Sequence, residues 1–325
     1  MQTEKKNRRT GLLCRLCVAT LCILLVLLTA CGPAKDDETQ KGTQGSLTDP
    51  EAESFSPSIA DAFGTESDGI LYVDVLSVGS ADCILVRCDG YVLVVDSGLS
   101  RSFDAIRSEL NRHGITRVDD FVVTHYDKDH IGGAAQLMTE FDVTRLIVPN
   151  YVRNSDLYLS MMETATRQDV EVMRLKEDFS IEREPLSVRI NVTHLYDKEG
   201  NLVLDADQRD GVDNDFSLLV ALQFRDRSAL LCADAERNRL NEFMNAGDVS
   251  FDWIKWPHHG NYIKAAQTLL EKSGADFVVV SAGYEAEADS ELLDMIGRDS
   301  VRAYYTWRGN VHIATDGSVW LAEYD

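Results

Sequence analysis

Two histidines and two carboxylates lie within six residues, directly after an apolar run. The segment reads Phe121-Val-Val-Thr-His125-Tyr-Asp127-Lys-Asp129-His130 and continues into a Gly-Gly pair. Imidazole and carboxylate groups are ligands of divalent metals, and a loop at a strand end lets such side chains converge on one point. Without a cation, the same groups packed together would suffer like-charge repulsion and loss of hydration. The segment therefore predicts a metal site in preference to a solvated polar loop.

Two further groups of residues are candidates for the same site. Asp234 follows the apolar run 229–232, and His258 and His259 lie between a proline and Gly260. Taken alone, Asp234 would be an ordinary carboxylate at a strand end, and the histidine pair would be a polar turn. Two adjacent histidines followed by glycine are rare as mere surface, so we expect all three residues to belong to the site.

Two other kinds of chemistry are not favoured. Ser217 and Ser281 lie outside any Gly-x-Ser-x-Gly turn, so the pattern does not indicate a serine nucleophile. The Gly132-Gly133 pair lacks the Gly-x-x-x-x-Gly-Lys spacing of a phosphate-binding loop.

Short strands alternating with amphipathic helices must position these residues. β-branched runs and bounding turns predict strands at 70–78, 83–87, 91–95, 120–123, 145–148, 187–194, 216–224, 229–232, 253–256, 277–281, 311–314 and 319–322. Helices are predicted at 103–113, 131–139, 157–168, 236–245, 263–272 and 290–297. Two strand-rich blocks, each covered by helices, indicate an α/β protein of the α+β kind in four layers, an αββα sandwich with two sheets packed face to face.

The segment from His125 to His130 resembles the signature of the metallo-β-lactamase superfamily, H-x-H-x-D-H, with Asp127 in place of the second histidine. The H-x-D-x-D-H form followed by Gly-Gly resembles the extracellular metallo-β-lactamase-like domain of the competence DNA-uptake protein ComEC. Six more motifs resemble that domain in the family's order, at 73–82, 94–98, 214–220, 231–234, 256–260 and 305–313. This resemblance implies a metallo-β-lactamase-like fold.

The resemblance also implies roles for individual residues. The metal ligands would be His125, Asp127, Asp129, His130, Asp234 and His258. Asp129 would also orient the nucleophile, and His259 would donate a proton or contact a phosphate. Asp96 would hold the ligands by hydrogen bonds, while Asn214 occupies the region of a histidine that this chain lacks. One or two divalent ions would bind, with zinc and manganese favoured and the added oxygen ligands also suiting magnesium or iron.

The chemistry implied is hydrolysis by metal-bound hydroxide. By the ComEC resemblance the substrate is a phosphodiester, which makes the chain a phosphodiesterase or nuclease with a possible place in DNA uptake. Two alternatives stay open: hydrolysis of an ester, lactone or lactam, or a non-catalytic surface lipoprotein that binds a ligand through a degenerate metal site. The sequence names no protein partner.

The first 31 residues predict a lipoprotein signal peptide. Basic residues precede the apolar run 16–28, which ends in Leu28-Thr29-Ala30-Cys31 and resembles the bacterial lipobox. Cys31 would carry the lipid and anchor the chain at the extracytoplasmic face of the membrane; the alternative is an uncleaved transmembrane anchor. Residues 32–68 are polar and predict a disordered tether, which leaves 69–325 as the hydrolase domain.

The composition constrains the partners of the folded part. Its three cysteines, Cys83, Cys88 and Cys232, form no disulfide framework and are predicted to be small core residues. The net charge of the chain is −22, and it becomes −26 once residues 1–30 are removed. Such a surface repels polyanions, so a nucleic acid would need a local basic patch or a metal, and a small or short substrate is favoured.

Overall fold

A computed structural model describes residues 57–194 and 213–325 of the chain. The predicted signal peptide, Cys31 and most of the predicted tether lie outside these residues. Among the described residues, no helix is both long and apolar enough to cross a membrane.

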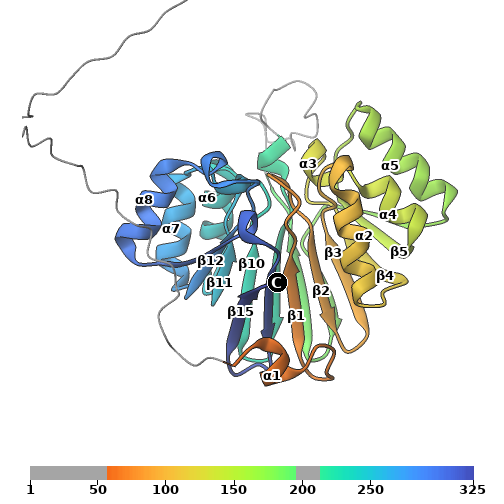
Figure 1. The fold of residues 1–325 in the computed structure, drawn as a ribbon. Helices are drawn as coiled ribbons and strands as arrows, with labels where there is room; N and C mark the ends of the chain where they lie inside the picture. The colour runs from red at the N-terminus through yellow and green to blue at the C-terminus, as the bar shows by residue number, and fades with distance from the viewer. Residues whose placement is uncertain (1–56, 195–212) are drawn as a thin grey trace, which may run out of the picture. The chain divides into compact units, whose positions relative to one another are not determined.

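Two mixed sheets form the centre of the molecule (Figure 1). The first has eight strands in the order β15-β14-β1-β2-β3-β4-β5-β6, and the second has seven in the order β13-β12-β11-β10-β9-β8-β7. The first sheet consists of β1 (Leu71–Val75), β2 (Ile84–Cys88), β3 (Tyr91–Val95), β4 (Arg117–Val122), β5 (Asp142–Pro149), β6 (Glu171–Leu175), β14 (Val311–Thr315) and β15 (Trp320–Tyr324). The second consists of β7 (Phe179–Arg183), β8 (Leu186–Asn191), β9 (Leu219–Phe224), β10 (Arg227–Leu231), β11 (Trp253–Lys255), β12 (Phe277–Val280) and β13 (Arg302–Tyr305).

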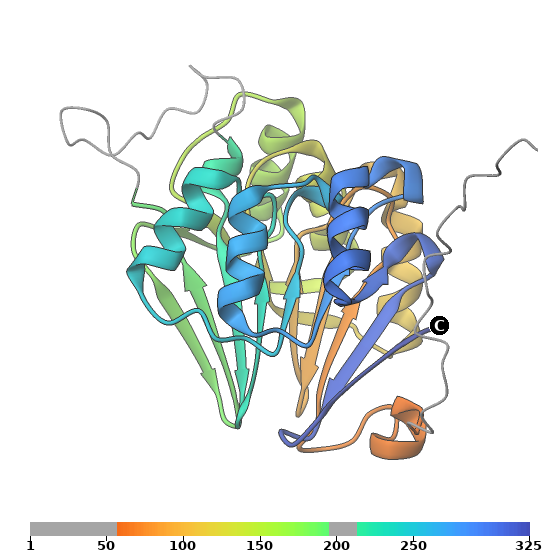
Figure 2. The same cartoon turned by 90° about the vertical axis from the view of Figure 1, so that its left-hand side faces the viewer.

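Helices cover the outer face of each sheet, as the two views show (Figures 1 and 2). The first sheet is covered by α2 (Phe103–Arg112), α4 (Ala134–Glu140) and α5 (Asp156–Arg167), and the second by α6 (Arg237–Ala246), α7 (Lys264–Ser273) and α8 (Ser290–Asp299). The short helix α3 (Lys128–Ile131) lies at one end of the sandwich, and α1 (Ile59–Phe63) lies at the other (Figure 1). The four-layer αββα architecture predicted from the sequence is confirmed.

Strand β3 shows why the sequence folds this way. Its run Tyr-Val-Leu-Val-Val is apolar throughout, because both faces of the sheet are covered. Tyr91, Leu93 and Val95 pack into the core between the two sheets, whereas Val94 packs under the helices. Each such side chain that leaves water contributes about 1.5–3 kcal/mol, which favours burial on both faces.

In each half of the chain, a series of antiparallel strands is followed by a series of parallel strands. Strand β2 pairs antiparallel with both β1 and β3, and β3 to β6 then pair in parallel. Likewise β7 to β10 are antiparallel and β10 to β13 parallel. Parallel strands end at the same edge of a sheet, and loops that follow such ends are common places for ligand sites.

The structure adds elements that the sequence did not predict. Strands β6, β7 and β13 were not expected, and neither was helix α1. Helix α1 changes one boundary, because Ile59 is only 7% exposed and packs with Tyr72 and Ala314. Residues 57–68, predicted as part of the tether, therefore belong to the folded domain, since the apolar side chain of Ile59 packs on it. The three cysteines of the described residues are free and buried, as expected.

Candidate metal centre

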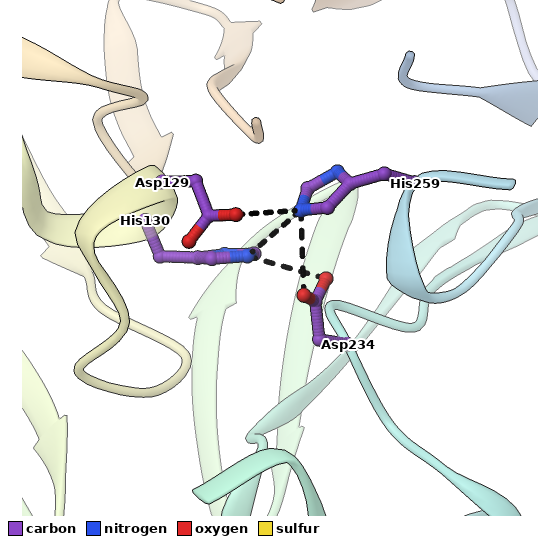
Figure 3. A group of neighbouring side chains, drawn as sticks. All are labelled: Asp129, His130, Asp234 and His259. Carbon is purple, nitrogen blue, oxygen red and sulfur yellow. Dashed lines mark hydrogen bonds and ion pairs between the residues drawn. The ribbon is translucent and has the colours of Figure 1, made fainter. Parts of the chain in front are cut away.

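Four side chains from distant parts of the chain meet in one group: Asp129, His130, Asp234 and His259 (Figure 3). His259 Nε2 lies 3.5 Å from Asp129 Oδ2, 3.3 Å from Asp234 Oδ2 and 3.3 Å from His130 Nε2. His130 Nε2 lies 3.2 Å from Asp234 Oδ1. One ligand atom from each of the four residues lies within 4.8 Å of the others, which is close enough for one ion to contact all of them.

Each of these residues follows the carboxyl end of a strand. Asp129 and His130 lie in α3, on the loop after β4, and Asp234 follows β10. His259 lies in the 3-10 helix η4 (His258–Gly260), directly after β11. The two β-rich halves therefore each contribute to one group, because their strands end at the same edge of the sandwich.

Asp96 holds the loop that carries His130. It follows β3, is completely buried and accepts hydrogen bonds from Thr124 N at 2.8 Å and Thr124 Oγ1 at 2.7 Å. His130 Nδ1 lies 2.7 Å from Asp96 Oδ2, so the geometry assigns the proton to Nδ1. That hydrogen bond turns the lone pair of His130 Nε2 toward Asp234 and His259, which is the arrangement that orients a ligating histidine.

His259 has the same tautomer for a different reason. Its Nδ1 lies 3.1 Å from the carbonyl oxygen of Ser281, which can only accept a hydrogen bond. The lone pair of His259 Nε2 therefore also points into the group. Two acceptor nitrogens and two carboxylates converge with no donor between them, and this arrangement needs a cation or added protons.

The pKa values of these side chains show that the group attracts positive charge. Burial acts to lower the pKa of His259, but Asp234 and Asp129 raise it to about 9. Burial likewise opposes the charged form of His130, yet Asp234 and Asp96 hold its pKa well above 6.5. Burial acts to raise the pKa of Asp234, but the charges of His259 and His130 outweigh it and lower the pKa well below 3.8. A field that attracts protons this strongly attracts a divalent cation as well.

His125 and Asp127 lie beside the four-residue group. The His125 and His130 rings are 4.0 Å apart between centroids, and His125 Nε2 lies 3.7 Å from Asp127 Oδ2. His125 is completely buried, and its Nε2 has no hydrogen-bond partner. A buried, unpartnered ring nitrogen next to a carboxylate fits a second ligand position for a metal ion.

Of the two neighbouring histidines, the structure places His259, and not the expected His258, in the group of four. His258 is 27% exposed in its side chain, and its Nε2 lies 3.9 Å from Asp234 Oδ2. His259, expected as the proton donor, is the one that joins the group of four. Both residues have a positive φ, 50° and 49°, so the backbone coils sharply here and turns His259 inward.

Asn214 contacts none of the candidate ligands directly. It lies in the 3-10 helix η3 (Asp213–Phe216), and its Nδ2 is 3.4 Å from Glu236 Oε1. The same Glu236 oxygen lies 3.4 Å from His258 Nδ1. Asn214 is thus linked to His258 through Glu236.

Two other acidic and histidine groups are less suited to a metal. Asp82, Asp96 and His130 lie together, but Asp82 already pairs with Lys255 and Ser281, and Asp96 with Thr124. In the group Asp74, Glu109 and His113, the carboxylates are paired with arginines and another histidine. Positive partners already satisfy these oxygens, so a cation would have to displace them.

A cavity of about 370 Å³ opens beside Asp127 and Asp129. Its other lining residues are Tyr126, Lys128, Arg153, Ser155 and Leu157. Lys128 is exposed, and Arg153 pairs with Asp213 and lies 3.6 Å from Asp127 Oδ1. Two cationic side chains thus line a pocket next to the candidate ligands.

Sequence comparison places this arrangement in a family. Residues 76–284, more than half of the chain, match the model of the metallo-beta-lactamase superfamily. The chain belongs to the metallo-beta-lactamase superfamily. Membership gives the coarse function, that of a metal-dependent hydrolase, and agrees with the divalent-metal chemistry of the donor set described above.

Two proteins are similar to this chain over most of its length. ComE operon protein 3 of Bacillus subtilis (strain 168) is 23% identical over 256 residues, which are 72% of this chain and 31% of that protein. Recombination protein 2 of Haemophilus influenzae is 26% identical over 217 residues, 65% of this chain and 24% of that protein. These relatives confirm the ComEC-like character of the metallo-beta-lactamase domain. The chain spans about a third or less of their length.

Solved structures are similar to this chain at low sequence identity. YhfI from Bacillus subtilis has a TM-score of 0.48 and is 9% identical, covering 78% of this chain and 100% of that one. A mutant of CmlA beta-hydroxylase also has a TM-score of 0.48 and is 17% identical, covering 72% of this chain and 52% of that one.

Several residues that support this candidate site have no role predicted from the sequence. Thr124, Lys255 and Ser281 each contact Asp82, Asp96 or His259. Asp82 was noted within a family motif, but its partners are more than 170 positions away in the chain. No local spacing signals such contacts, because they form only when the two sheets pack.

Proposed function

We propose that this chain is a metal-dependent phosphodiesterase held at the extracytoplasmic face of the membrane by a lipid on Cys31. The observation that carries the substrate class is the pocket beside the candidate centre, where Lys128 and Arg153 line the approach to Asp127 and Asp129. The chain as a whole has a net charge of −22, whereas in the lining of this pocket the two cations balance the two carboxylates. Positive groups next to acidic metal ligands favour an anionic substrate over a neutral ester or lactam.

In this proposal Asp129, His130, Asp234 and His259 hold one cation, and His125 and Asp127 hold a second. A bound divalent cation supplies Lewis-acid chemistry, since it acidifies water and polarises a phosphoryl oxygen. Asp129 would also orient the nucleophile. The proposed ion is zinc or manganese. Asp96 and Thr124 fix the ring of His130, while Lys128 and Arg153 bind the non-bridging oxygens of the phosphodiester.

His258 takes the role of proton donor to the leaving group. Its ring is partly exposed beside Asp234, whereas the His259 ring is held by Ser281 and faces the other ligands. A general acid must reach the substrate and exchange protons with solvent, and the more exposed ring meets both conditions.

A substrate panel tests the function. The full-length protein, purified in detergent and loaded with manganese or zinc, is assayed on bis(p-nitrophenyl) phosphate, short single-stranded DNA and nitrocefin. We expect turnover of the two phosphodiesters, since the pocket favours anions. Turnover of nitrocefin alone would favour the lactam alternative, and metal uptake without any turnover would favour a binding lipoprotein.

The pocket is tested by Arg153→Gln and Lys128→Gln. Each is expected to raise KM for bis(p-nitrophenyl) phosphate about 10-fold with a smaller change in kcat, because a charged hydrogen bond contributes roughly 1.5–3 kcal/mol. Arg189→Gln is the matched control, since Arg189 is largely exposed, pairs with Asp178 and does not line the cavity. Equal effects of all three substitutions would remove the support for an anion-binding pocket.

The anchor is tested separately. Cells that express the protein are grown with radiolabelled palmitate, and we expect label in the wild type that is absent in Cys31→Ala. Label that persists in the variant would contradict lipidation at this cysteine.

A further inference from the structure

A lysine with no contact to solvent lies behind the candidate metal centre. Lys255 ends strand β11, and its exposed fraction is 0%. Its ammonium group forms an ion pair with Asp82, which is 1% exposed, and lies 3.3 Å from the carbonyl oxygen of Ala233. A buried ammonium is costly to keep without such partners, and a buried ion pair is weak evidence for stability alone.

The pair contacts the backbone around two candidate ligands. Asp82 N donates to the carbonyl oxygen of Asp129 at 3.2 Å, and Lys255 Nζ donates to Ala233, the residue before Asp234. Ala233 also accepts a hydrogen bond from His258 N at 3.0 Å. The carbonyl group of Ala233 therefore joins Lys255 to the turn that carries the histidine pair.

The other oxygen of Asp82 faces the back of His259. Ser281 Oγ donates to Asp82 Oδ1 at 2.5 Å, and the same carboxylate oxygen lies 3.6 Å from His259 Nδ1. His259 Nδ1 is also 3.3 Å from Ser281 Oγ and 3.1 Å from Ser281 O. Among the residues that the structure describes, His259 Nδ1 has its polar contacts with Ser281 and Asp82, and Nε2 faces Asp129, Asp234 and His130.

The backbone at Ala233 and at the two histidines has a conformation that contacts from other residues must hold in place. Ala233, His258 and His259 all have φ near +50°, a conformation that residues with a Cβ seldom adopt. Such residues persist where the surrounding structure holds them in place. Lys255 holds the carbonyl of Ala233, and the network with Asp82 and Ser281 holds the ring of His259.

We propose that Lys255 and Asp82 are positioning residues that fix the ring orientation and tautomer of His259, so that its Nε2 can ligate a cation. Lys255 neutralises Asp82 and anchors it. Asp82 in turn orients the Ser281 hydroxyl. Ser281 and Asp82 together keep the proton on His259 Nδ1. Only the consequence for metal binding rests on the proposed function. The orientation of the ring does not depend on it.

The test compares Lys255→Met with the double variant Lys255→Met/Asp82→Asn. The single substitution leaves Asp82 buried and unpaired and is expected to destabilise the fold. The double variant removes both charges with little change in volume and is expected to fold. Arg145→Met/Asp120→Asn is the matched control. Arg145 on β5 pairs through Nε with Asp120 on β4 at 2.6 Å, and Asp120 is 1% exposed. Neither residue contacts His259.

Two measurements on the folded double variant decide the proposal. In metal-free protein at a pH above the His259 pKa of about 9, where the ring is neutral, the ring ¹⁵N signals of His259 are expected to change from the Nδ1-protonated pattern of the wild type to a mixture of tautomers. In titration calorimetry with zinc and manganese, affinity is expected to fall about 10- to 100-fold, as is typical when a partner that orients a ligand is removed. The control double variant is expected to match the wild type in both measurements.

The outcomes separate this proposal from the proposed function. A folded double variant with the wild-type ¹⁵N pattern and wild-type metal affinity would show that the pair is only structural and would overturn the proposal. A wild type that binds neither metal would contradict the proposed function, and the ¹⁵N comparison would then still decide whether Lys255 and Asp82 position His259.

Discussion

His258 and His259 are neighbours in the chain but contribute different surfaces to the site. The ring of His259 is held from behind by Ser281 and directs Nε2 toward Asp129, Asp234 and His130. The ring of His258 is partly exposed, and its closest carboxylate contacts are with Glu236 and, at 3.9 Å, Asp234. Under the proposed function, this difference in burial and orientation assigns ligation to His259 and proton transfer to His258.

The two alanine variants should separate these roles. His259→Ala is expected to lower metal affinity by more than the roughly 10- to 100-fold that loss of an outer partner costs, because a ligand itself is removed. His258→Ala is expected to retain the metal and to lower kcat on the order of 10²-fold or more, as is typical when a general acid is lost. Elemental analysis and steady-state kinetics measure the two effects. Metal retained in His259→Ala and lost in His258→Ala would reverse the assignment.

At the scale of elements, the loop after β4 is held against the loop after β3 with almost no space between their backbones. Ser97 N donates to His130 O at 2.7 Å, and Ser100 Oγ donates to Gly132 O at 2.7 Å. A Cβ at Gly132 would lie 2.4 Å from Ser100 N and 2.6 Å from Gly98 O. The glycines after the His125–His130 segment therefore allow this close approach, which brings Asp96 to His130.

Gly132→Ala should push the two loops apart. We expect a loss of stability of about 1–3 kcal/mol, toward the upper end because the clashing atoms belong to backbone, together with weaker metal binding. Chemical denaturation and calorimetric titration measure these changes. Gly247→Ala is the control: no heavy atom lies within 4 Å of a Cβ there, so its stability should stay within about 0.5 kcal/mol of the wild type. Wild-type stability and metal affinity in Gly132→Ala would contradict the close-approach role.

At the scale of the whole domain, a second buried charge cluster ties the carboxyl-terminal hairpin to the first strands. His312 on β14 lies opposite Asp74 on β1, and its Nδ1 is 2.7 Å from Asp74 Oδ1. Arg87 on β2 pairs with the other oxygen of Asp74 at 3.0 Å. Strands from the two ends of the domain are therefore joined by groups that titrate.

This cluster makes stability depend on pH. Burial opposes the charged form of His312, but the hydrogen bond and charge of Asp74 raise its pKa above 6.5. Burial likewise acts to raise the pKa of Asp74, yet His312 and Arg87 lower it below 3.8. A raised histidine pKa contributes stability that is fully present below about pH 6.5 and is lost as the pH rises through the folded-state value. A lowered carboxyl pKa contributes stability above about pH 3.8 that is lost as the pH falls through its folded-state value.

The wild type should therefore have a larger free energy of unfolding than His312→Gln. This difference should be largest between about pH 4 and 6.5 and should shrink above that range. Urea unfolding at pH 5, 6.5 and 8.5, with a chelator present so that bound metal does not contribute, measures the difference. A difference that is constant across these pH values would show that the pair does not titrate as proposed.

The amino-acid sequence by itself determined the features that depend on local spacing. The apolar runs predicted most strands and helices, and the cluster from His125 to His130 indicated metal chemistry because its ligand types lie within one loop. The predicted strands omitted β6, β7 and β13, and each of these is an edge strand. Edge strands are partly exposed and carry charged residues such as Glu171, Arg183 and Arg302, so their apolar pattern is weak.

Only the tertiary structure decided which histidine of the 258–259 pair faces the ligands, because the answer depends on backbone with positive φ and on Ser281 behind the ring. It alone brought Lys255 to Asp82, which are 173 positions apart, and His312 to Asp74, which are 238 apart. Such contacts form when separate strands end at one edge or pair in one register. Their energy comes from packing and burial, and a one-dimensional pattern of residue types does not encode which distant partners will meet.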